Sequence, residues 1–320
     1  MARKYDDDVA RLDEAARAGW LYYIAGNTQD EIARKLGVSR QTAQRLVSTS
    51  IAEKLIRVRL DHPIGVCLEL AANVKAAYGL DYCEVVPSDP DSNLSLIGVA
   101  GAAAAELERY LISPHPILVA MGTGRMLRAI ADQLAPMECP QHKIVSLVGN
   151  IAPDGSASLY DAVSRVGERV KAPYYPMPLP VIATTVHEKS LLLAQKTLRN
   201  VVDLAEQADL TFVGIGTIDN DAALLRDGFV KPEEIRSLMR AGAVGEIIGW
   251  AYDAKGKLID GLTNDRVLSV PIQNNPKRRV TGVAMAPNRL QAIKGALNGH
   301  LINGLITNEN MATSLLQQQN

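Results

Sequence analysis

Short apolar runs alternate with longer amphipathic stretches from about residue 66 to the end of this 320-residue chain. The apolar runs predict strands over 82–86, 117–121, 144–148, 210–215, 247–252 and 301–306. Helices are predicted over 94–111, 125–134, 158–170, 188–206 and 288–297. Buried strands that alternate with helices form a mainly parallel sheet with helices on both faces. The pattern therefore predicts an α/β domain of the doubly wound type.

The first 60 residues follow a different pattern, which predicts three helices. Thr28 and Glu31 form a capping-box pattern at the start of one short helix, and Gly37 is suited to end it. Ser39 is a good N-cap for the next helix, and Ala33 is small enough to let the two helices cross closely. An earlier helix over 8–25 would complete a three-helix unit and offers these side chains to its core: Ala15, Leu21, Tyr22 and Ile24.

The second helix of this pair is predicted to show a polar face to solvent. Its spacing turns Ala43, Leu46 and Val47 inward. Arginine and glutamine side chains on the other face can hydrogen-bond guanine and adenine edges in a major groove. The segment 1–60 also carries 11 Lys/Arg against 8 Asp/Glu. We expect a helix-turn-helix, with a solvated helical hairpin as the alternative, and the predicted DNA-binding residues are Thr28, Ser39, Arg40, Gln41, Thr42, Gln44 and Arg45.

The pattern changes near residue 60, which predicts two domains over 1–60 and 61–320. The stretch 51–60 contains Leu55, Ile56 and Val58, so a short strand or a helix extension is expected to join them. Pro63 and Gly65 mark the boundary.

Three loops of the larger segment follow predicted strands, where ligands collect in a doubly wound sheet. The first, Gly122-Thr123-Gly124-Arg125, leads into a helix whose free N–H groups can bind an anion or a hydroxyl. A simple strand-to-helix turn is the alternative. The second, at Thr217, brings Asp219, Asn220 and Asp221, which suit paired hydroxyls or form an Asx-rich turn. The third holds Asp253, with Lys294 on a later helix as a cation or a solvated side chain.

Five segments together give the chain its resemblance to a known family. They are DEIARKLGVSRQTAQRLV at 30–47, VAMGTGRML at 119–127, VGIGTID at 213–219, GAVGEIIGWAYDAKG at 242–256, and NRLQAIKGALNGHLINGLITNENMATSLL at 288–316. In this order and spacing they resemble the SorC family of sugar-responsive transcription regulators.

The resemblance implies a helix-turn-helix head joined to an effector domain that is similar in fold to sugar-phosphate isomerases. It implies that Gly122, Thr123, Gly124 and Arg125 line a phosphate-type pocket, with Thr217, Asp219, Asp253 and Lys294 around the sugar. The implied partners are operator DNA, a sugar, polyol or sugar-phosphate effector, and further copies of the chain in a homodimer or homotetramer.

An enzyme of the isomerase or deaminase class is the alternative function. Asp219, Asp221 and Glu246 beside Lys294 could transfer protons, but the sequence has no clear nucleophile–base pair. We therefore expect no catalytic residues.

Cofactors and export signals are not expected either. The five histidines and three cysteines are scattered without metal-ligand spacing. The start of the chain lacks the apolar core of a secretion signal, and no apolar run is long enough to cross a bilayer. We expect a soluble, cytoplasmic protein without metal or cofactor.

Overall fold

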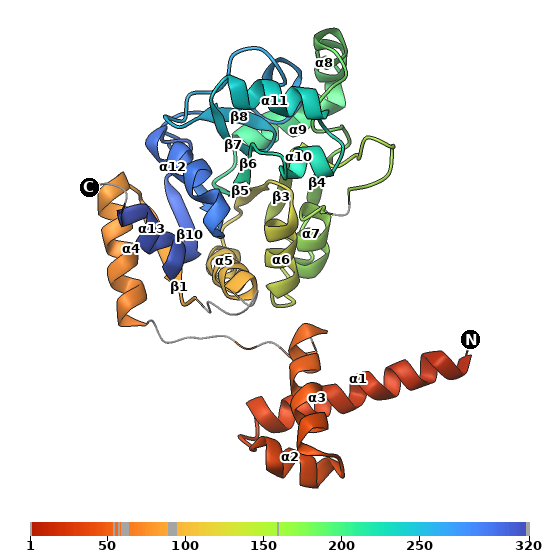
Figure 1. Cartoon of the computed structure of the whole chain (residues 1–320). Coiled ribbons are helices and arrows are strands. Elements are labelled where there is room, and N and C mark those ends of the chain that lie inside the picture. Colours follow the sequence, from red (N-terminus) through yellow and green to blue (C-terminus); the bar gives the residue numbers. More distant parts are fainter. Residues whose placement is uncertain are drawn as a thin grey trace. The chain divides into compact units, whose positions relative to one another are not determined.

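The computed structural model describes residues 2–53, 55–56, 58, 64–88, 95–158 and 160–317, with the backbone alone for 2–9 and 95. The chain divides into two compact units, Met1–His62 and Pro63–Asn320 (Figure 1). The predicted domain boundary at residue 60, the predicted boundary marker Pro63 and the first residue of the predicted helix 94–111 all lie outside the described residues. Of the predicted joining segment 51–60, only residues 51–53, 55–56 and 58 are described.

The smaller unit, hereafter the head, contains three helices: α1 (Ala2–Tyr23), α2 (Gln29–Leu36) and α3 (Arg40–Ala52). The predicted capping box is confirmed, because Glu31 N donates to Thr28 Oγ1 at 3.3 Å and Thr28 N donates to Glu31 Oε2 at 2.7 Å. Gly37 ends α2 in the left-handed conformation with φ 67°. Ser39 Oγ accepts from Thr42 N at 3.1 Å at the start of α3.

The core of the head lies where α1 crosses the other two helices. The buried residues are Ala15, Ala18, Ile32, Ala33, Ala43, Leu46 and Val47. Gly19 makes the closest approach, since a Cβ there would overlap the side chain of Ser50. The prediction that Tyr22 and Ile24 face the core is wrong. Ile24 lies beyond the end of α1 and is 66% exposed, and Tyr22 packs edge-on against Tyr23 with ring centroids 4.9 Å apart.

The larger unit, hereafter the body, is built on a seven-stranded parallel sheet, which confirms the predicted fold class. The strand order is β1-β10-β9-β5-β2-β3-β4. The strands are β1 (Tyr82–Val86), β2 (Leu118–Met121), β3 (Lys143–Gly149), β4 (Tyr174–Met177), β5 (Leu210–Gly214), β9 (Arg279–Val283) and β10 (Gly304–Asn308). A second, antiparallel sheet contains β6 (Gly216–Thr217), β7 (Ala243–Ile247) and β8 (Trp250–Asp253).

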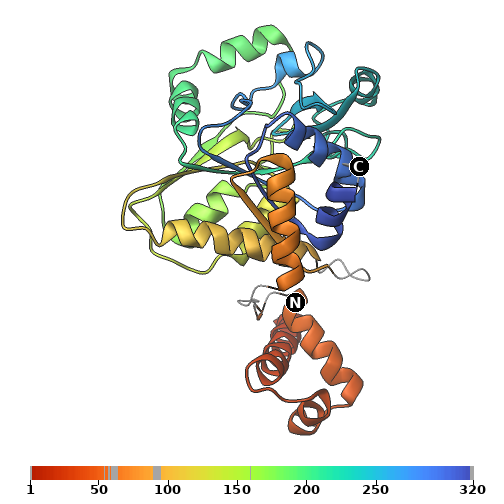
Figure 2. The same cartoon turned by 90° about the vertical axis from the view of Figure 1, so that its left-hand side faces the viewer.

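Helices cover both faces of the parallel sheet (Figure 2). One face packs against α4 (Gly65–Tyr78), α9 (Lys196–Glu206), α12 (Leu290–Asn298) and α13 (Glu309–Gln317). The other packs against α5 (Ser95–Leu111), α6 (Arg125–Gln133) and α7 (Val163–Val170). The remaining elements are α8 (Val186–Leu193), α10 (Ala223–Arg226), α11 (Pro232–Arg240) and the 3-10 turns η1 (Asn264–Arg266) and η2 (Pro287–Arg289). Within the described residues, no helix is long and apolar enough to span a membrane.

Two predicted elements are wrong in their continuity. The predicted strand 247–252 is a hairpin, in which β7 and β8 meet at a two-residue turn with Ile247 paired to Trp250. The predicted helix 188–206 is broken between α8 and α9, where Gln195 takes an extended conformation and serves as the N-cap of α9. The sequence reading also missed β4, β6 and β9.

Candidate functional site

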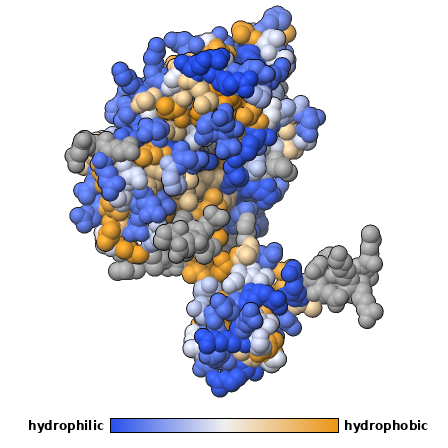
Figure 3. All heavy atoms as spheres, in the orientation of Figure 1, coloured by the Kyte–Doolittle hydropathy of each residue, from blue (hydrophilic) through white to orange (hydrophobic). Residues whose placement is uncertain are grey.

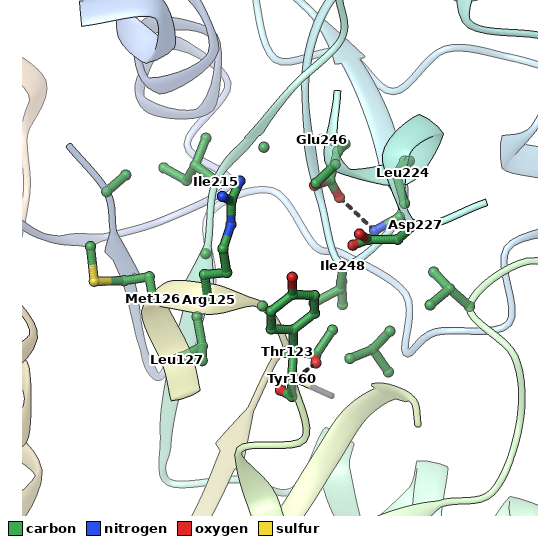
Figure 4. A pocket seen from close by; sticks show the side chains of 18 of the residues that line it. Thr123, Arg125, Met126, Leu127, Tyr160, Ile215, Leu224, Asp227, Glu246 and Ile248 are labelled. Atoms are coloured by element: carbon green, nitrogen blue, oxygen red, sulfur yellow. Dashed lines mark hydrogen bonds between the residues drawn. The ribbon is translucent and has the colours of Figure 1, made fainter. Parts of the chain in front are cut away.

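A cavity of about 510 Å³ lies at the carboxyl ends of four neighbouring parallel strands (Figure 4). Its walls include residues that follow or end β3, β2, β5 and β9. The next strand of the parallel sheet after β2 is β3, which lies on one side of the β2–β5 pair. The next strand of this sheet after β5 is β9, which lies on the other side of that pair. This reversal makes the boundary between β2 and β5 the topological switch point, where doubly wound proteins bind ligands.

One wall is formed by the loop that leads from β2 into α6. Gly122 N donates to Phe212 O at 2.9 Å, which holds the loop against β5. Gly124 has φ 115° and is the N-cap residue of α6. No side chain at this position accepts a hydrogen bond from the first N–H groups of α6. Thr123 Oγ1 donates to Tyr160 O at 2.8 Å, and Arg125 is an exposed lining residue. These groups favour an anion.

The opposite wall carries Glu246, the charged residue of β7. Glu246 Oε2 accepts from Gly249 N at 2.8 Å. Gly216, the first residue of β6, leaves room for the carboxylate, because a Cβ on Gly216 would overlap it. Burial raises the pKa of Glu246, while the Gly249 N–H and the charge of Arg289 act in the opposite direction.

Arg289, the last residue of η2, faces the same cavity. Its guanidinium donates to the carbonyl of Ile215, which fixes the side chain beside the end of β5. Burial lowers the pKa of Arg289, and the charge of Glu246 opposes this effect. Arginine stays protonated at neutral pH, so the cavity combines cations at Arg125 and Arg289 with the carboxyl groups of Glu246 and Asp227. This mixed set of charges suits a small molecule with an anionic group and hydroxyls.

Of the residues predicted from the sequence to bind an effector, Thr123, Gly124 and Arg125 line the cavity. Gly122, the first residue of the same loop, is buried and is not a lining residue. The other four, Thr217, Asp219, Asp253 and Lys294, are not lining residues of it.

Two of these four have their carboxylates turned to their own loops. Asp219 Oδ1 accepts from Asp221 N at 2.8 Å, although the charge of Asp219 still acts on Arg289. Asp253 Oδ1 accepts from the backbone N–H groups of Lys255 and Lys257, each at 2.9 Å. Thr217 ends β6, and Lys294 lies half-buried on α12.

Sequence reasoning missed Arg289 and Tyr160 as lining residues. Arg289 follows β9 by a few residues and precedes α12, so it has the same relation to a strand end as Arg125. The criterion of a charged residue after a strand would have found it. The strand signal of β9 is weak, so the sequence alone does not mark Arg289 as a residue that follows a strand.

The residues considered for catalysis do not converge in this cavity. Glu246 lines it, whereas Asp219, Asp221 and Lys294 do not. Among the described residues, no group of three or more His, Cys, Asp or Glu side chains could hold a metal ion.

In the head, α3 presents its polar residues to solvent. Arg40, Gln41, Gln44 and Arg45 are exposed. Arg40 Nε lies 3.5 Å from Asp30 Oδ1 on α2, an exposed ion pair of small energetic value. Ser39 and Thr42 share a hydrogen bond of 2.9 Å at the start of α3, and Thr28 caps α2.

Comparisons with known proteins agree for both units. A sugar-binding domain family, Sugar-bind, matches residues 62–317, and a homeodomain-like domain family matches residues 10–55. The chain is 31% identical to the erythritol catabolism regulatory protein EryD of Brucella abortus, over 96% of this chain and 97% of that protein. It is 31% identical to the transcriptional regulator LsrR of Klebsiella pneumoniae, over 96% and 94%. The crystal structure of the full-length sorbitol operon regulator SorC from Klebsiella pneumoniae superimposes with a TM-score of 0.72 and 25% identity, over 94% of this chain and 97% of that one.

Proposed function

Because the chain belongs to the SorC family of sugar-responsive transcription regulators, we propose that α3 binds operator DNA while the cavity of the body holds the effector. The chain is a DNA-binding regulator with a sugar-binding domain. Our proposal assigns these two activities to named residues. It also places the protein in the cytoplasm, where operator DNA lies.

The observation that carries the proposal is the cavity at the β2/β5 switch point, which combines the cations Arg125 and Arg289 with the carboxyl groups of Glu246 and Asp227. The first turn of α6, Arg125 and Arg289 supply donors for a phosphate or another anionic group. Glu246 can accept hydrogen bonds from hydroxyl groups. We therefore propose a polyol phosphate or sugar phosphate as effector.

Two relatives support a polyol as the parent compound. EryD of Brucella abortus is named for erythritol catabolism, and SorC of Klebsiella pneumoniae is named for a sorbitol operon. Both compounds are polyols. Thr217, Asp219, Asp253 and Lys294 remain predicted effector residues. Among them, Asp219 is supported by its electrostatic effect on Arg289.

On DNA, we propose that Ser39, Arg40, Gln41, Thr42, Gln44 and Arg45 contact the duplex, with Thr28 at the start of α2 near the backbone. Their exposure on one helix supports base contacts in a major groove. We propose that the chain acts as a homodimer or homotetramer, which would present several heads to a repeated site. Val66 and Leu68 on α4, 59% and 55% exposed, offer apolar surface for subunit contact, and Figure 3 shows hydrophobic surface along the edge that carries α4.

We propose that the chain is not an enzyme. Its relatives are regulators, and the carboxylates considered for proton transfer do not share the cavity. Steady-state turnover of a sugar phosphate that is lost in Asp219→Asn would contradict this.

The assignment of the two activities is tested by separating them. Arg45→Ala is expected to weaken operator binding by about 1–3 kcal/mol if the side chain contacts a base, with ligand binding unchanged.

Arg289→Ala is expected to abolish the rise in melting temperature that a panel of polyol and sugar phosphates produces, with operator binding retained. Arg278→Ala is the matched control, because Arg278 precedes β9 at the amino end of the strand, opposite to the cavity. Its Nη1 lies 3.7 Å from Asp209 Oδ1. Loss of DNA binding in Arg289→Ala with a normal ligand response would contradict the assignment.

A further inference from the structure

The turn between β7 and β8 contains an isoleucine in a conformation that such residues rarely adopt. The two central residues of the turn, Ile248 and Gly249, have φ values of 47° and 90°. A two-residue hairpin turn with positive φ at both positions normally contains asparagine, aspartate or glycine. A β-branched residue in the left-handed region is strained, and such strain persists only where the surroundings impose it.

Contacts on both sides hold this turn. Gly249 N donates to Glu246 Oε2 at 2.8 Å, and a Cβ on Gly249 would lie 2.9 Å from Val181 Cγ1. The next residue, Trp250, donates from Nε1 to Val270 O at 3.0 Å. The hydrogen bonds and the close packing therefore keep Ile248 in the left-handed region.

The strained conformation directs the Ile248 side chain into the wall of the effector cavity. Figure 4 shows Ile248 between Glu246 and the Thr123–Tyr160 pair. A Cβ added to Gly122 would lie 3.1 Å from Ile248 Cγ2, so the isoleucine reaches the loop that precedes α6. Its branched apolar side chain thus stands between the anion-binding wall and the carboxylate wall.

We propose that Ile248 is a specificity-determining residue for the effector. The inference rests on the proposed function, because it concerns the same cavity. An effector whose anionic group lies at α6 and whose hydroxyls reach Glu246 must pass Ile248. Its bulk favours a narrow open-chain polyol phosphate and disfavours a cyclic sugar phosphate, which is wider at this point.

The experiment compares an open-chain and a cyclic ligand of similar size, glucitol 6-phosphate and glucose 6-phosphate, by calorimetric titration of the full-length protein. Wild type is expected to bind the open-chain compound more tightly. Ile248→Gly fits the turn without strain and removes the side chain, so we expect the affinity ratio to shift toward the cyclic compound by about 10-fold or more. A melting temperature near that of wild type shows that the variant is folded.

Leu262→Gly is the matched control, because Leu262 also has positive φ, 53°, but does not line this cavity. Its affinity ratio is expected to equal that of wild type. An unchanged ratio in a folded Ile248→Gly that binds ligand would overturn the role of Ile248 and leave the proposed function in place. If wild type binds none of a wider panel of sugars, polyols and their phosphates, the proposed function is contradicted, and this inference with it.

Discussion

Glu246 is the side chain whose ionisation most directly connects stability with ligand binding. Burial raises its pKa in the folded protein, so folding favours the protonated carboxyl group. The free-energy cost that the ionised Glu246 adds to folding is absent below the pKa of a glutamate in the unfolded chain, about 4.3. This cost grows as the pH rises through the raised pKa of the folded protein. Ionisation of Glu246 in the cavity is therefore costly, and hydroxyl donors of an effector would reduce that cost.

Glu246→Gln tests this directly, since glutamine keeps an oxygen that can accept from Gly249 N but carries no charge. We expect the variant to melt above wild type at pH 7–8, with the difference shrinking as the pH falls toward 4. Its affinity for a polyol phosphate should fall by about 10-fold or more, because hydrogen bonds to a charged acceptor contribute about 1.5–3 kcal/mol. Melting curves of wild type and variant that coincide at every pH would contradict the assigned cost.

Among the helices, the crossing of α1 and α3 depends on Gly19. A methyl group there would overlap the side chain of Ser50 and lie about 2.5 Å from Ile56 Cδ1. We expect Gly19→Ala to destabilise the head by about 1–3 kcal/mol through overpacking, and so to weaken DNA binding near the melting temperature of the head. Thermal unfolding followed by circular dichroism measures this.

Gly101→Ala is the matched control for Gly19→Ala. Gly101 lies within α5, and a Cβ there meets no atom within 4 Å. Alanine has the higher helix propensity at both sites, so Gly101→Ala should be neutral or stabilising. Equal effects of the two substitutions would show that packing at the α1–α3 crossing is not limiting.

The elements that the sequence predicted well are those whose signals are local. The capping box of Thr28 and Glu31, the left-handed Gly37 and the Ser39 cap depend on a few neighbouring residues, and all three are present. The turn at Ile248 was missed because its conformation is imposed by distant partners such as Val181. Strand β9 was missed because Thr281 and Gly282 weaken its apolar pattern. Gly282 is needed there, since a Cβ would lie 2.8 Å from Ile302 Cδ1.

The same difference explains how much of the site could be predicted. The Gly122–Arg125 loop follows a strand that the sequence makes obvious, so three of its residues were placed at the cavity wall by position alone. Arg289 depends on β9 for its position, and Asp253 ends β8 but turns its carboxylate to the turn that follows. The order of elements along the chain gave the location of the site, whereas side-chain direction did not follow from it.

For the whole molecule, the account requires that ligand binding in the body change the affinity of the heads for DNA. An effector can do this only if it binds one arrangement of the subunits better than another. A differential of about 1–3 kcal/mol corresponds to a change of roughly 5–150-fold in operator affinity. This coupling is reciprocal, so operator DNA must change effector affinity by the same factor.

The most direct test is a fluorescence-anisotropy titration of a duplex that the purified full-length protein selects from a random library. The titration is run without ligand and with the polyol or sugar phosphate that most raises the melting temperature. We predict that saturating ligand shifts the dissociation constant by about 5–150-fold, and that Arg289→Ala removes the shift while binding the duplex as wild type does. Wild-type titration curves that coincide with and without saturating ligand would contradict the account.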